Sequence, residues 1–336
     1  MSGDPTIYDI AARAGVGIAT VSRVLNAHPR VKVETRDAVL KACADLGFRP
    51  NRAARRLAAG GPNRPRVAAL APLFATAFAY GVTRPLAAGL AAAGIDLVLY
   101  DIPDRETKQR TLDRLLGERA CEGLVLCSMG IGPERAAQFA AARIPVVAVD
   151  HPCDGLPAAT IDNRAAMRLA VEVLRERGAR RIAHLAGGDA LAYRERRAGF
   201  VAAAGAAAPV VPAETPTREG GAAACGILLD AHPDIDAIAC ASDAIAVGAL
   251  EECRRRGLAA PDRIQIMGFD DQPFMDVIGL STVRQPVAGF GAWAAQAVAA
   301  LCADPGAAVT PVLLPVSVVE RQTTRTPAAP SRRRGR

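Results

Sequence analysis

Three polar side chains near the N-terminus share one face of a short predicted helix. Thr20, Ser22 and Arg23 lie opposite an apolar set that starts at Val21 and continues three and four residues later, which is helical spacing. Hydroxyl groups bind phosphate oxygens and so position a protein on DNA, whereas a guanidinium can grip phosphate or pair with guanine. These residue types, at this spacing, indicate contact with nucleic acid.

No comparable pattern indicates catalysis. None of the three lysines follows a glycine, so there is no Walker A motif, and the chain contains neither H-E-x-x-H nor G-x-S-x-G. Gly15-Val16-Gly17 follows a predicted helix rather than a strand, and Gly130-Ile131-Gly132 lacks the third glycine of a dinucleotide fingerprint. The four histidines show no metal-ligand spacing. We therefore expect no enzyme, no metal site and no cofactor.

The polar face belongs to the second of three predicted helices. The first helix covers Ile7–Ala14, and Thr6 and Asp9 have the spacing of a capping box at its start. The second covers Ala19–Asn26 after a short glycine-containing turn, so the pair makes a helix-turn-helix whose second helix would lie in the major groove. A third helix is predicted over Thr35–Leu46, followed by Gly47.

The distribution of charge supports a polyanionic partner for this end of the chain. Residues 1–66 hold twelve Arg and Lys against five acids, and residues 321–336 hold six Arg and no acid. The net charge of the whole chain is +7, so the stretch between them is acidic. A basic front end on an acidic body is typical of a protein that binds nucleic acid, although a solvated charged surface would give the same composition.

The rest of the chain alternates short apolar runs with alanine-rich helical stretches. This pattern predicts parallel sheets covered by helices on both faces, arranged as two sheets with a cleft between them. The predicted strands are Val67–Ala71, Asp96–Tyr100, Gly123–Cys127, Val146–Val149, Arg181–Leu185, Ala237–Ala241 and Ile264–Gly268.

The cellular compartment follows from what the sequence lacks. No apolar run approaches the roughly eighteen residues of a membrane span, and the polar start with Asp4 is unlike a secretory signal. The eight cysteines contain no C-x-x-C pair, and most lie in apolar stretches, which favours buried free thiols. We expect a cytoplasmic protein that has no contact with a membrane.

Several motifs of the N-terminal region resemble the headpiece and hinge of the LacI/GalR family of bacterial transcriptional regulators. They are Thr6-Ile7-Tyr8-Asp9-Ile10-Ala11, Ala14-Gly15-Val16, Thr20-Val21-Ser22-Arg23-Val24-Leu25-Asn26, Thr35-Arg36 and Pro50-Asn51-Arg52-Ala53-Ala54-Arg55-Arg56-Leu57. The resemblance implies that Ile18 and Ala19 select operator bases, where two apolar side chains offer contact with thymine methyls but no hydrogen bonds, and that Asn26 at the end of this helix also contacts DNA.

The same resemblance gives the hinge its role. It implies that Leu57 wedges into the minor groove at the operator centre, while Asn51 and Ala54 face that groove. The helical piece that starts at Pro50 has only about two turns, which is marginal for an isolated helix in water. Two residues depart from the family pattern, because Gly17 and Lys32 stand where caps of the second and third helices are usual, and each lost cap costs up to about 1 kcal/mol.

The body of the chain resembles the sensor of the same family, which has a periplasmic-binding-protein-like fold. The motifs that carry this resemblance are Asp162-Asn163, Arg196-Arg197-Ala198-Gly199-Phe200, Ala241-Ser242-Asp243, Gly268-Phe269-Asp270-Asp271 and Leu280-Ser281-Thr282-Val283-Arg284-Gln285-Pro286. The resemblance implies that Arg196, Ser242, Asp270 and Gln285 hold the effector. Phe74 and Phe78, in the loop after the first strand, are expected to form a hydrophobic wall; Asp162 and Asp243 could equally brace loops.

These expectations combine into one prediction. The chain comprises a helix-turn-helix headpiece at residues 1–50, a hinge and linker at 51–66, a two-lobed effector-binding and dimerisation domain at 67–326, and a basic tail at 327–336. It is expected to be a homodimeric repressor on pseudo-palindromic double-stranded operator DNA, controlled by a small molecule. A carbohydrate is the first choice of effector, and a purine or sugar phosphate the second. Two rivals remain: a solute sensor that no longer regulates DNA, and a regulator whose cleft is vestigial.

Overall fold

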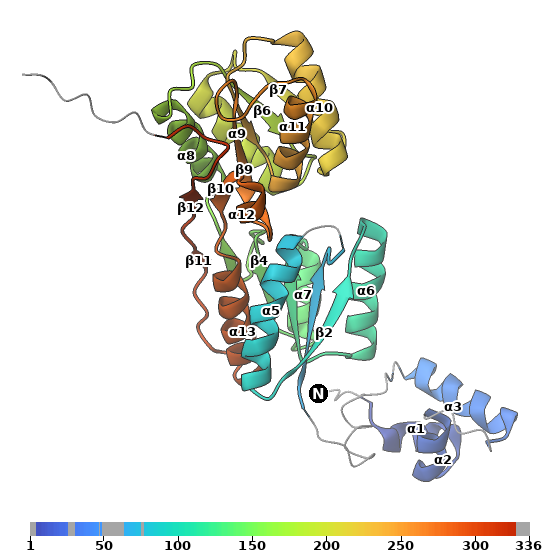
Figure 1. The fold of residues 1–336 in the computed structure, drawn as a ribbon. Coiled ribbons are helices and arrows are strands. Elements are labelled where there is room, and N and C mark those ends of the chain that lie inside the picture. Colours follow the sequence, from blue (N-terminus) through green and yellow to red (C-terminus); the bar gives the residue numbers. More distant parts are fainter. Residues whose placement is uncertain (1–4, 26–30, 47, 49–63, 75–76, 327–336) are drawn as a thin grey trace, which may run out of the picture. The chain divides into compact units, whose positions relative to one another are not determined.

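The computed structural model describes residues 5–25, 31–46, 48, 64–74 and 77–326 (Figure 1). The chain divides into two compact units, Met1–Pro65 with Glu106–Cys121, and Arg66–Arg105 with Glu122–Arg336. Four residues predicted to bind DNA, and the basic tail, lie outside the described residues: Asn26, Asn51, Ala54, Leu57 and residues 327–336.

The first unit contains the three predicted headpiece helices, α1 (Ile7–Ala14), α2 (Ile18–Leu25) and α3 (Val33–Asp45), and also α6 (Arg105–Glu118). The headpiece core is small, and Ile10, Val21 and Val39 are its fully buried aliphatic side chains. The periodicity of the sequence predicted all three helices, with ends displaced by one or two residues, and this part of the prediction is confirmed.

Two local features fix the ends of the first helix. The backbone N–H of Thr6 donates to Asp9 Oδ2 at 2.7 Å, as the capping box requires. Gly15 ends α1 in the left-handed region at φ 67°, which a residue with a side chain rarely adopts. The turn to the second helix is therefore short, and the helix-turn-helix follows from a capping box and one glycine.

The second unit contains twelve strands and eight helices in its described residues. The strands are β1 Arg66–Ala71, β2 Asp96–Asp101, β3 Gly123–Cys127, β4 Val146–Val149, β5 Ala158–Thr160, β6 Ile182–Ala186, β7 Val210–Pro212, β8 Ala237–Cys240, β9 Gln265–Asp270, β10 Ser281–Arg284, β11 Val312–Leu313 and β12 Ser317–Val319. The helices are α5 Ala77–Ala92, α7 Pro133–Ala141, α8 Asn163–Glu176, α9 Leu191–Ala204, α10 Arg218–Ala231, α11 Asp243–Arg255, α12 Met275–Ile278 and α13 Val287–Ala303.

The strands form two six-stranded sheets, which we name by lobe. The N-lobe sheet has the order β11-β5-β4-β3-β1-β2, and the C-lobe sheet has the order β12-β10-β9-β8-β6-β7. All described pairings are parallel except that of β10 with β12. The central strands β3, β4, β6 and β8 are buried along their whole length, as parallel strands covered on both faces must be. The predicted fold of two parallel α/β subdomains is confirmed.

The chain passes between the lobes three times. It leaves the N-lobe sheet after β5 and enters α8, returns after β10 at Gln285, and crosses again between β11 and β12. On its return it forms α13, which packs against α5 so closely that a Cβ on Gly291 would clash with the Val82 carbonyl oxygen. Figure 1 shows these two helices side by side. The crossings bring residues from distant parts of the sequence to one place between the sheets.

The sequence pattern missed the short strands. The seven predicted strands all exist, with ends displaced by no more than two residues, but β5, β7, β10, β11 and β12 were not predicted. Each has only two to four residues, and none contains the four consecutive apolar residues that mark the equally short strands β4 and β8. Among the described residues, no helix is long and apolar enough to cross a membrane. All eight cysteines are free thiols, and six of them are buried.

Candidate functional site

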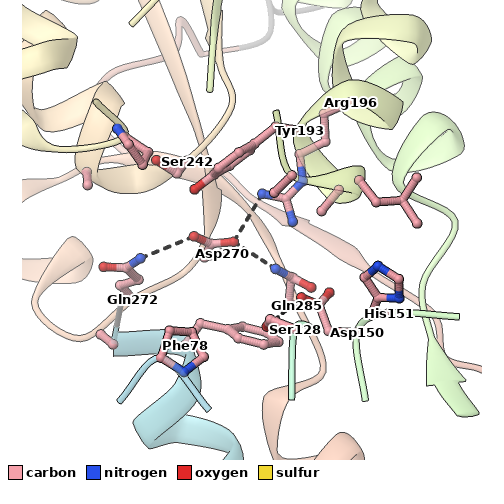
Figure 2. Close-up of a pocket in the computed structure, with 17 residues that line it drawn as sticks. Phe78, Ser128, Asp150, His151, Tyr193, Arg196, Ser242, Asp270, Gln272 and Gln285 are labelled. Carbon is pink, nitrogen blue, oxygen red and sulfur yellow. Dashed lines mark hydrogen bonds and ion pairs between the residues drawn. The ribbon is translucent and has the colours of Figure 1, made fainter. Parts of the chain in front are cut away.

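A cleft of about 290 Å³ opens between the two lobes (Figure 2). Its volume is close to the lower end of pockets that bind small ligands, roughly 300–1,000 Å³. Phe78 contributes an aromatic face from the N-lobe, and Tyr193 contributes one from the C-lobe. Polar side chains from both lobes converge between these rings, so the cleft has the make-up of a small-molecule site.

Arg196, on α9, is the cation of the cleft and is 3% exposed. Its Nε donates to Asn163 Oδ1 at 2.9 Å, and its Nη1 donates to the Ala241 carbonyl oxygen at 2.8 Å. Its Cζ lies 3.7 Å from the centroid of the Phe269 ring, which is cation–π distance. The guanidinium is thereby held in one orientation before any ligand arrives.

Asp270 ends β9 and receives hydrogen bonds from three side chains, as Figure 2 shows. Gln285 Nε2 donates to its Oδ1 at 2.7 Å, Arg196 Nη1 to the same oxygen at 3.5 Å, and Gln272 Nε2 to its Oδ2 at 3.1 Å. Burial raises the pKa of Asp270, while Arg196 and the amide donors oppose that rise. Its φ of 119° is unusual for a residue with a side chain, and strained backbone of this kind is common at functional sites.

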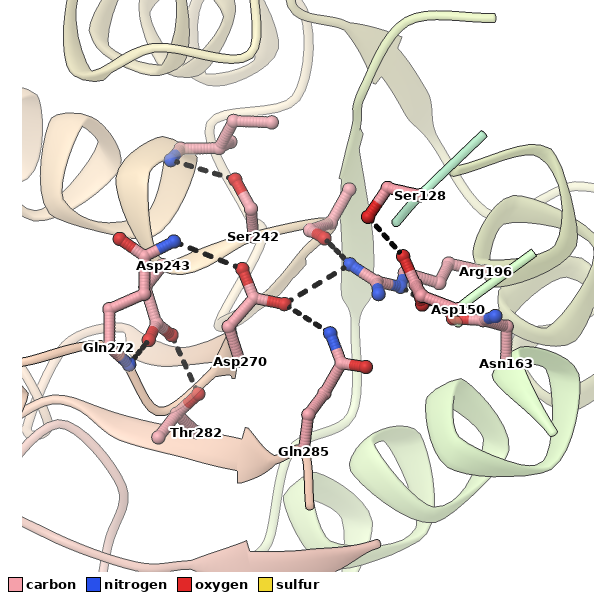
Figure 3. Close-up of polar contacts among 12 residues, drawn as sticks. Ser128, Asp150, Asn163, Arg196, Ser242, Asp243, Asp270, Gln272, Thr282 and Gln285 are labelled. Carbon is pink, nitrogen blue, oxygen red and sulfur yellow. Dashed lines mark hydrogen bonds and ion pairs between the residues drawn. The ribbon is translucent and has the colours of Figure 1, made fainter. Parts of the chain in front are cut away.

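Asp243 lies behind this group and braces it (Figure 3). Thr282 Oγ1 donates to its Oδ1 at 2.6 Å, and the backbone N–H of Gln272 donates to its Oδ2 at 2.7 Å. Burial is the main reason that its pKa is raised to about 8. Asp162 has a local contact too, because it caps α8 by accepting from the Ala165 N–H at 2.8 Å. The sequence left open whether these two carboxylates bind the effector or brace loops, and the structure gives both of them bracing contacts.

Sequence reasoning missed the polar group on the N-lobe side of the cleft. Asp150 follows β4, and its Oδ2 accepts from Ser128 Oγ at 2.8 Å. Burial raises the pKa of Asp150 to about 6, while Arg196 and Ser128 oppose the rise. His151 also lines the cleft. A usable signal was present, since ligands of open α/β sheets bind at the carboxyl ends of parallel strands, and these residues follow β3 and β4.

The structure brings together five of the six side chains predicted to hold the effector. Phe78, Arg196, Ser242, Asp270 and Gln285 all line the cleft. Ser242 has a second contact, because its Oγ accepts from the Ile245 N–H at 3.4 Å and so caps α11.

Phe74 is not placed in the cleft lining, which corrects the prediction of a wall built by two phenylalanines. It is 89% exposed, because the chain turns directly after β1, where the Leu73 N–H donates to Asp101 Oδ1 at 2.9 Å. The sequence placed Phe74 and Phe78 in one loop after the strand, but α5 begins at Ala77 and carries only Phe78 inward.

The predicted DNA-contacting residues of α2 lie on its accessible face. Ile18 is 42% exposed, Ala19 and Arg23 are also exposed, and Thr20 and Ser22 are half-buried. The opposite face is buried, because Val21 and Val24 belong to the headpiece core. The helix therefore presents small, apolar and cationic groups outward, which suits contact with DNA bases and phosphates.

The cleft is arranged for binding rather than for chemistry. Arg196 and the amide of Gln285 both donate to Asp270, and Ser128 donates to Asp150, so the polar side chains of the cleft are held in fixed orientations around the space that a ligand would fill. Among the described residues, no three His, Cys, Asp or Glu side chains gather as a metal site. The arrangement supports reversible recognition of a small polar molecule.

Comparison with known proteins agrees with both halves of this description. Residues 6–51 match the family model of bacterial regulatory proteins of the lacI family, and residues 171–324 match that of the periplasmic binding protein-like domain. The ribose operon repressor of Halalkalibacterium halodurans is 33% identical over 294 residues, which cover 85% of this chain and 87% of the relative. The transcriptional regulator CelR of Thermobifida fusca is 34% identical over 301 residues, covering 84% and 87% of the two chains.

Two solved structures resemble the whole chain. The lac repressor dimer bound to operator and the anti-inducer ONPF has a TM-score of 0.70 and 26% identity, covering 96% of this chain and 100% of that one. The complex of CelR with cellobiose has a TM-score of 0.68 and 29% identity, covering 95% and 99%. These relatives are transcriptional regulators and not enzymes. The chain therefore belongs to the LacI family and is a DNA-binding transcriptional regulator.

Proposed function

We propose that this regulator is a repressor whose affinity for its operator is controlled by a sugar bound in the cleft between the lobes. The observation that carries the proposal is the buried group of Arg196, Asp270 and Gln285, which lines the cleft where the chain crosses from the C-lobe to the N-lobe. A ligand on these residues also meets Phe78 and Asp150 of the N-lobe, which line the same cleft, and so affects the relative position of the lobes.

The chemistry of the cleft favours a polyol as effector. A carboxylate accepts two hydrogen bonds, a guanidinium donates a fork, and aromatic rings cover the apolar faces of a sugar ring. Phe78, Tyr193, Arg196 and Asp270 supply all three groups. One relative is named as a ribose operon repressor and another was solved with cellobiose, which supports the same class. A purine or a sugar phosphate is the second candidate.

We assign operator contact to the outward face of α2 and to the hinge sequence. Ile18 and Ala19 select bases, Thr20 and Ser22 bind phosphates, and Arg23 does either. Asn26 extends this set, and Asn51, Ala54 and Leu57 enter the minor groove at the operator centre. Replacing Leu57 with Ala should weaken operator binding and reduce bending of the duplex, and unchanged binding would remove the hinge from the mechanism.

We also propose that the regulator acts as a cytoplasmic homodimer with two headpieces on one pseudo-palindromic operator. Exposed apolar side chains on the sensor support a second copy: Tyr80 on α5 is 63% exposed, and Phe274 and Val277 beside and within α12 are 73% and 79% exposed. Tyr80 lines a groove with Pro273, the residue before Phe274, so Tyr80 and Phe274 lie near one another on the surface. Light scattering should give twice the mass of the chain.

Control by the effector then follows from the marginal stability of the predicted hinge helix. A change in the angle between the lobes alters the spacing of the two hinge segments of the dimer. Because so short a helix is barely stable alone, a small change in spacing can melt it and release the DNA. The effector must bind the two lobe arrangements with different affinities for this to happen.

The test uses duplexes selected from a random pseudo-palindromic library. Fluorescence anisotropy should show specific binding whose affinity falls steeply with salt, and a sugar in a panel of sugars, sugar phosphates and purines should change it. A chain that binds no duplex specifically would be a solute sensor only. Specific binding that no ligand changes would point to a vestigial cleft.

A further inference from the structure

Two thiols lie in contact in the apolar core of the C-lobe, away from the cleft. Cys225 on α10 and Cys253 on α11 are 28 positions apart in the sequence, and their Sγ atoms are 3.9 Å apart. Both side chains are fully buried among apolar neighbours. Neither thiol takes part in the proposed contacts to DNA or effector, so the reason for their contact lies elsewhere.

The sulfurs meet because α10 and α11 pack backbone against backbone. A Cβ on Gly221 of α10 would clash with the Ile245 carbonyl oxygen of α11. In the same way, a Cβ on Gly248 of α11 would clash with the Arg218 carbonyl oxygen of α10. Figure 1 shows the two helices side by side on the C-lobe. Cys225 lies one helical turn after Gly221, so the close approach of the helices extends to the thiols.

Only a small movement separates this contact from a covalent bond. At 3.9 Å no atom fits between the two sulfurs, so no side chain has to leave before they can join. A disulfide holds its sulfurs about 2.05 Å apart, which requires each sulfur to move by roughly 1 Å. Rotation about the Cα–Cβ bond of each cysteine supplies a displacement of this size. The backbones of α10 and α11 can therefore stay where they are.

The two thiols differ in how readily they lose a proton. The hydrogen bond from Cys225 lowers the pKa of Cys253, although burial opposes this effect, and the guanidinium of Arg256 adds to the lowering. Burial alone has the opposite result at Cys127, where it raises the pKa to about 12. Because the thiolate is the nucleophile in cysteine oxidation, Cys253 is the thiol of the pair that reacts first.

The position of Cys253 gives a small oxidant a way in. This residue lies in the last turn of α11, which ends at Arg255. Directly after the helix, Arg256 ties α11 to α10, because its Nη2 donates to the Gly226 carbonyl oxygen at 3.2 Å and its Nη1 to Asp230 Oδ1 at 2.6 Å. The Asp230 side chain is 71% exposed, so this tie is open to water and can break locally. Hydrogen peroxide is small and uncharged, and can therefore enter an apolar core at such an opening.

We propose that Cys225 and Cys253 form a site of reversible oxidation, at which hydrogen peroxide converts the two thiols to a disulfide that links α10 to α11. The Cys253 sulfur attacks the peroxide, so an S–O bond forms, the O–O bond breaks, and the departing hydroxide takes up the thiol proton as water. The Cys225 sulfur then attacks the sulfenic acid, so the S–S bond forms, the S–O bond breaks, and a second water leaves with the proton of Cys225. Two thiols are thereby oxidised by two electrons while one peroxide is reduced to two waters.

The disulfide should stabilise the C-lobe against unfolding. It closes a loop that spans 28 positions and so restricts the unfolded chain. The oxidised protein should therefore melt about 5–10 °C higher than the reduced protein, and dithiothreitol should reverse the rise by thiol–disulfide exchange. Disulfides of this reversible kind are typical of redox sensing in reducing compartments. Neither cysteine lines the cleft, so the oxidation is independent of the proposed function.

The experiment treats the folded full chain with hydrogen peroxide, blocks the remaining thiols with iodoacetamide and maps the peptides by mass spectrometry without reduction. Cleavage before aspartate puts Cys225, Cys240 and Cys253 on separate peptides, because Asp230 and Asp243 lie between them. We expect a pair of peptides joined through Cys225 and Cys253, which dithiothreitol separates. In concentrated urea, where the helices are unfolded, this pair should lose its preference over other pairs. Folded protein that yields no such pair, or that joins Cys253 to Cys240 instead, overturns the proposal.

A pair of variants tests the effect on stability. Cys253→Ala removes one of the two sulfurs, so peroxide should no longer raise the melting temperature. Cys240→Ala is the matched control, because Cys240 is a fully buried thiol of the same core, and its variant should keep the rise. Each variant is compared with its own reduced form, so that a loss of stability caused by the substitution itself cancels. A rise that persists in Cys253→Ala, or that is absent from the parent, overturns the proposal.

Discussion

The headpiece and the cleft use their residues in opposite ways. In the headpiece, the candidate contacts to DNA that the structure describes fall within six consecutive residues on one helix, Ile18 to Arg23. In the cleft, the polar groups come from positions between Ser128 and Gln285, and the crossings between two sheets bring them together. The first site is encoded locally, while the second depends on the whole fold.

The difference extends to how each region is stabilised. The described headpiece is held by a handful of buried side chains, of which Ile10, Val21 and Val39 are fully enclosed. The sensor has two large clusters of buried apolar side chains, one of which contains residues of both lobes, and the cleft holds a polar network whose members are themselves buried. The headpiece should stay folded when its outward residues are replaced and should unfold when a buried core residue is truncated. The cleft should lose ligand binding when a residue of its polar network is replaced.

Removing Arg196 should have the largest effect in the molecule. Arg196→Met leaves Asp270 buried without its cation and leaves Asn163 Oδ1 and the Ala241 carbonyl oxygen without their donor. Breaking a buried ion pair at one side costs about 3–5 kcal/mol. Urea unfolding should show this loss, and sugar binding should disappear. Arg197→Met, at the exposed neighbouring position, is the control and should change stability and sugar binding little. Equal losses in both variants would show that the hydrogen bonds of Arg196 are not what stabilises the cleft.

Truncating a residue of the headpiece core should abolish operator binding without affecting ligand binding by the sensor. Ile10 is fully buried between the headpiece helices, and replacing it with Ala removes methyl groups at a cost of about 2–5 kcal/mol. We expect loss of operator binding in anisotropy with sugar affinity in calorimetry unchanged. Leu40→Ala, at a position on α3 that is 51% exposed, serves as control. Loss of sugar binding in Ile10→Ala would contradict the separation of the two sites.

The pKa of Asp150 should make the stability of the sensor depend on pH. Because its pKa rises from 3.8 to about 6 on folding, the folded chain binds more protons than the unfolded chain between these values, and this contribution to stability is lost as the pH rises through 6. Urea unfolding should therefore show a free energy of unfolding about 1–3 kcal/mol higher for Asp150→Asn than for the parent at pH 7. This difference should disappear below pH 4. The difference between the two proteins across pH reports Asp150 together with its interaction with Asp270, whose charge contributes to the raised pKa; parallel curves would contradict a raised pKa of Asp150.

The fold was largely predictable because its signals are local and repeated. The capping box at Thr6, the glycine at position 15 and the helical spacing around Val21 each specify headpiece structure without reference to distant residues. The buried strands of the sensor can be recognised in the sequence as continuous apolar runs. Strands of two or three residues, such as β5 and β11, were missed because they gain their order from the sheet they join.

The cleft was only partly predictable for the same reason. Resemblance to the family pointed to Arg196, Asp270 and Gln285, which do line it, but Asp150 and Ser128 follow ordinary apolar strands and carry no motif. Their role depends on the strand order that sets β3 beside β4 and on a hydrogen bond between residues 22 positions apart. Phe74 shows the converse, because a suitable residue in a suitable loop still points to solvent.

The smallest expected effect tests how the local site reads sequence. Ile18 and Ala19 have no hydrogen-bonding side chain, so they can distinguish thymine only through its methyl group. Replacing dT by dU in an operator half-site removes that methyl and no hydrogen-bonding atom, and should cost about 0.8 kcal/mol per contacted methyl. The same replacement outside the half-sites should cost nothing.

A double-mutant cycle assigns this effect to one side chain. Ile18→Ala should bind the dT and dU operators with equal affinity if Ile18 supplies the contact, because the side chain that met the methyl is gone. A dU penalty that survives in Ile18→Ala would move the reading to another residue of the helix, with Ala19 the next to test. If the replacement of dT by dU costs no affinity in either protein, Arg23 and the shape of the DNA remain as the sources of specificity. Recognition would then depend on more than the first residues of this helix.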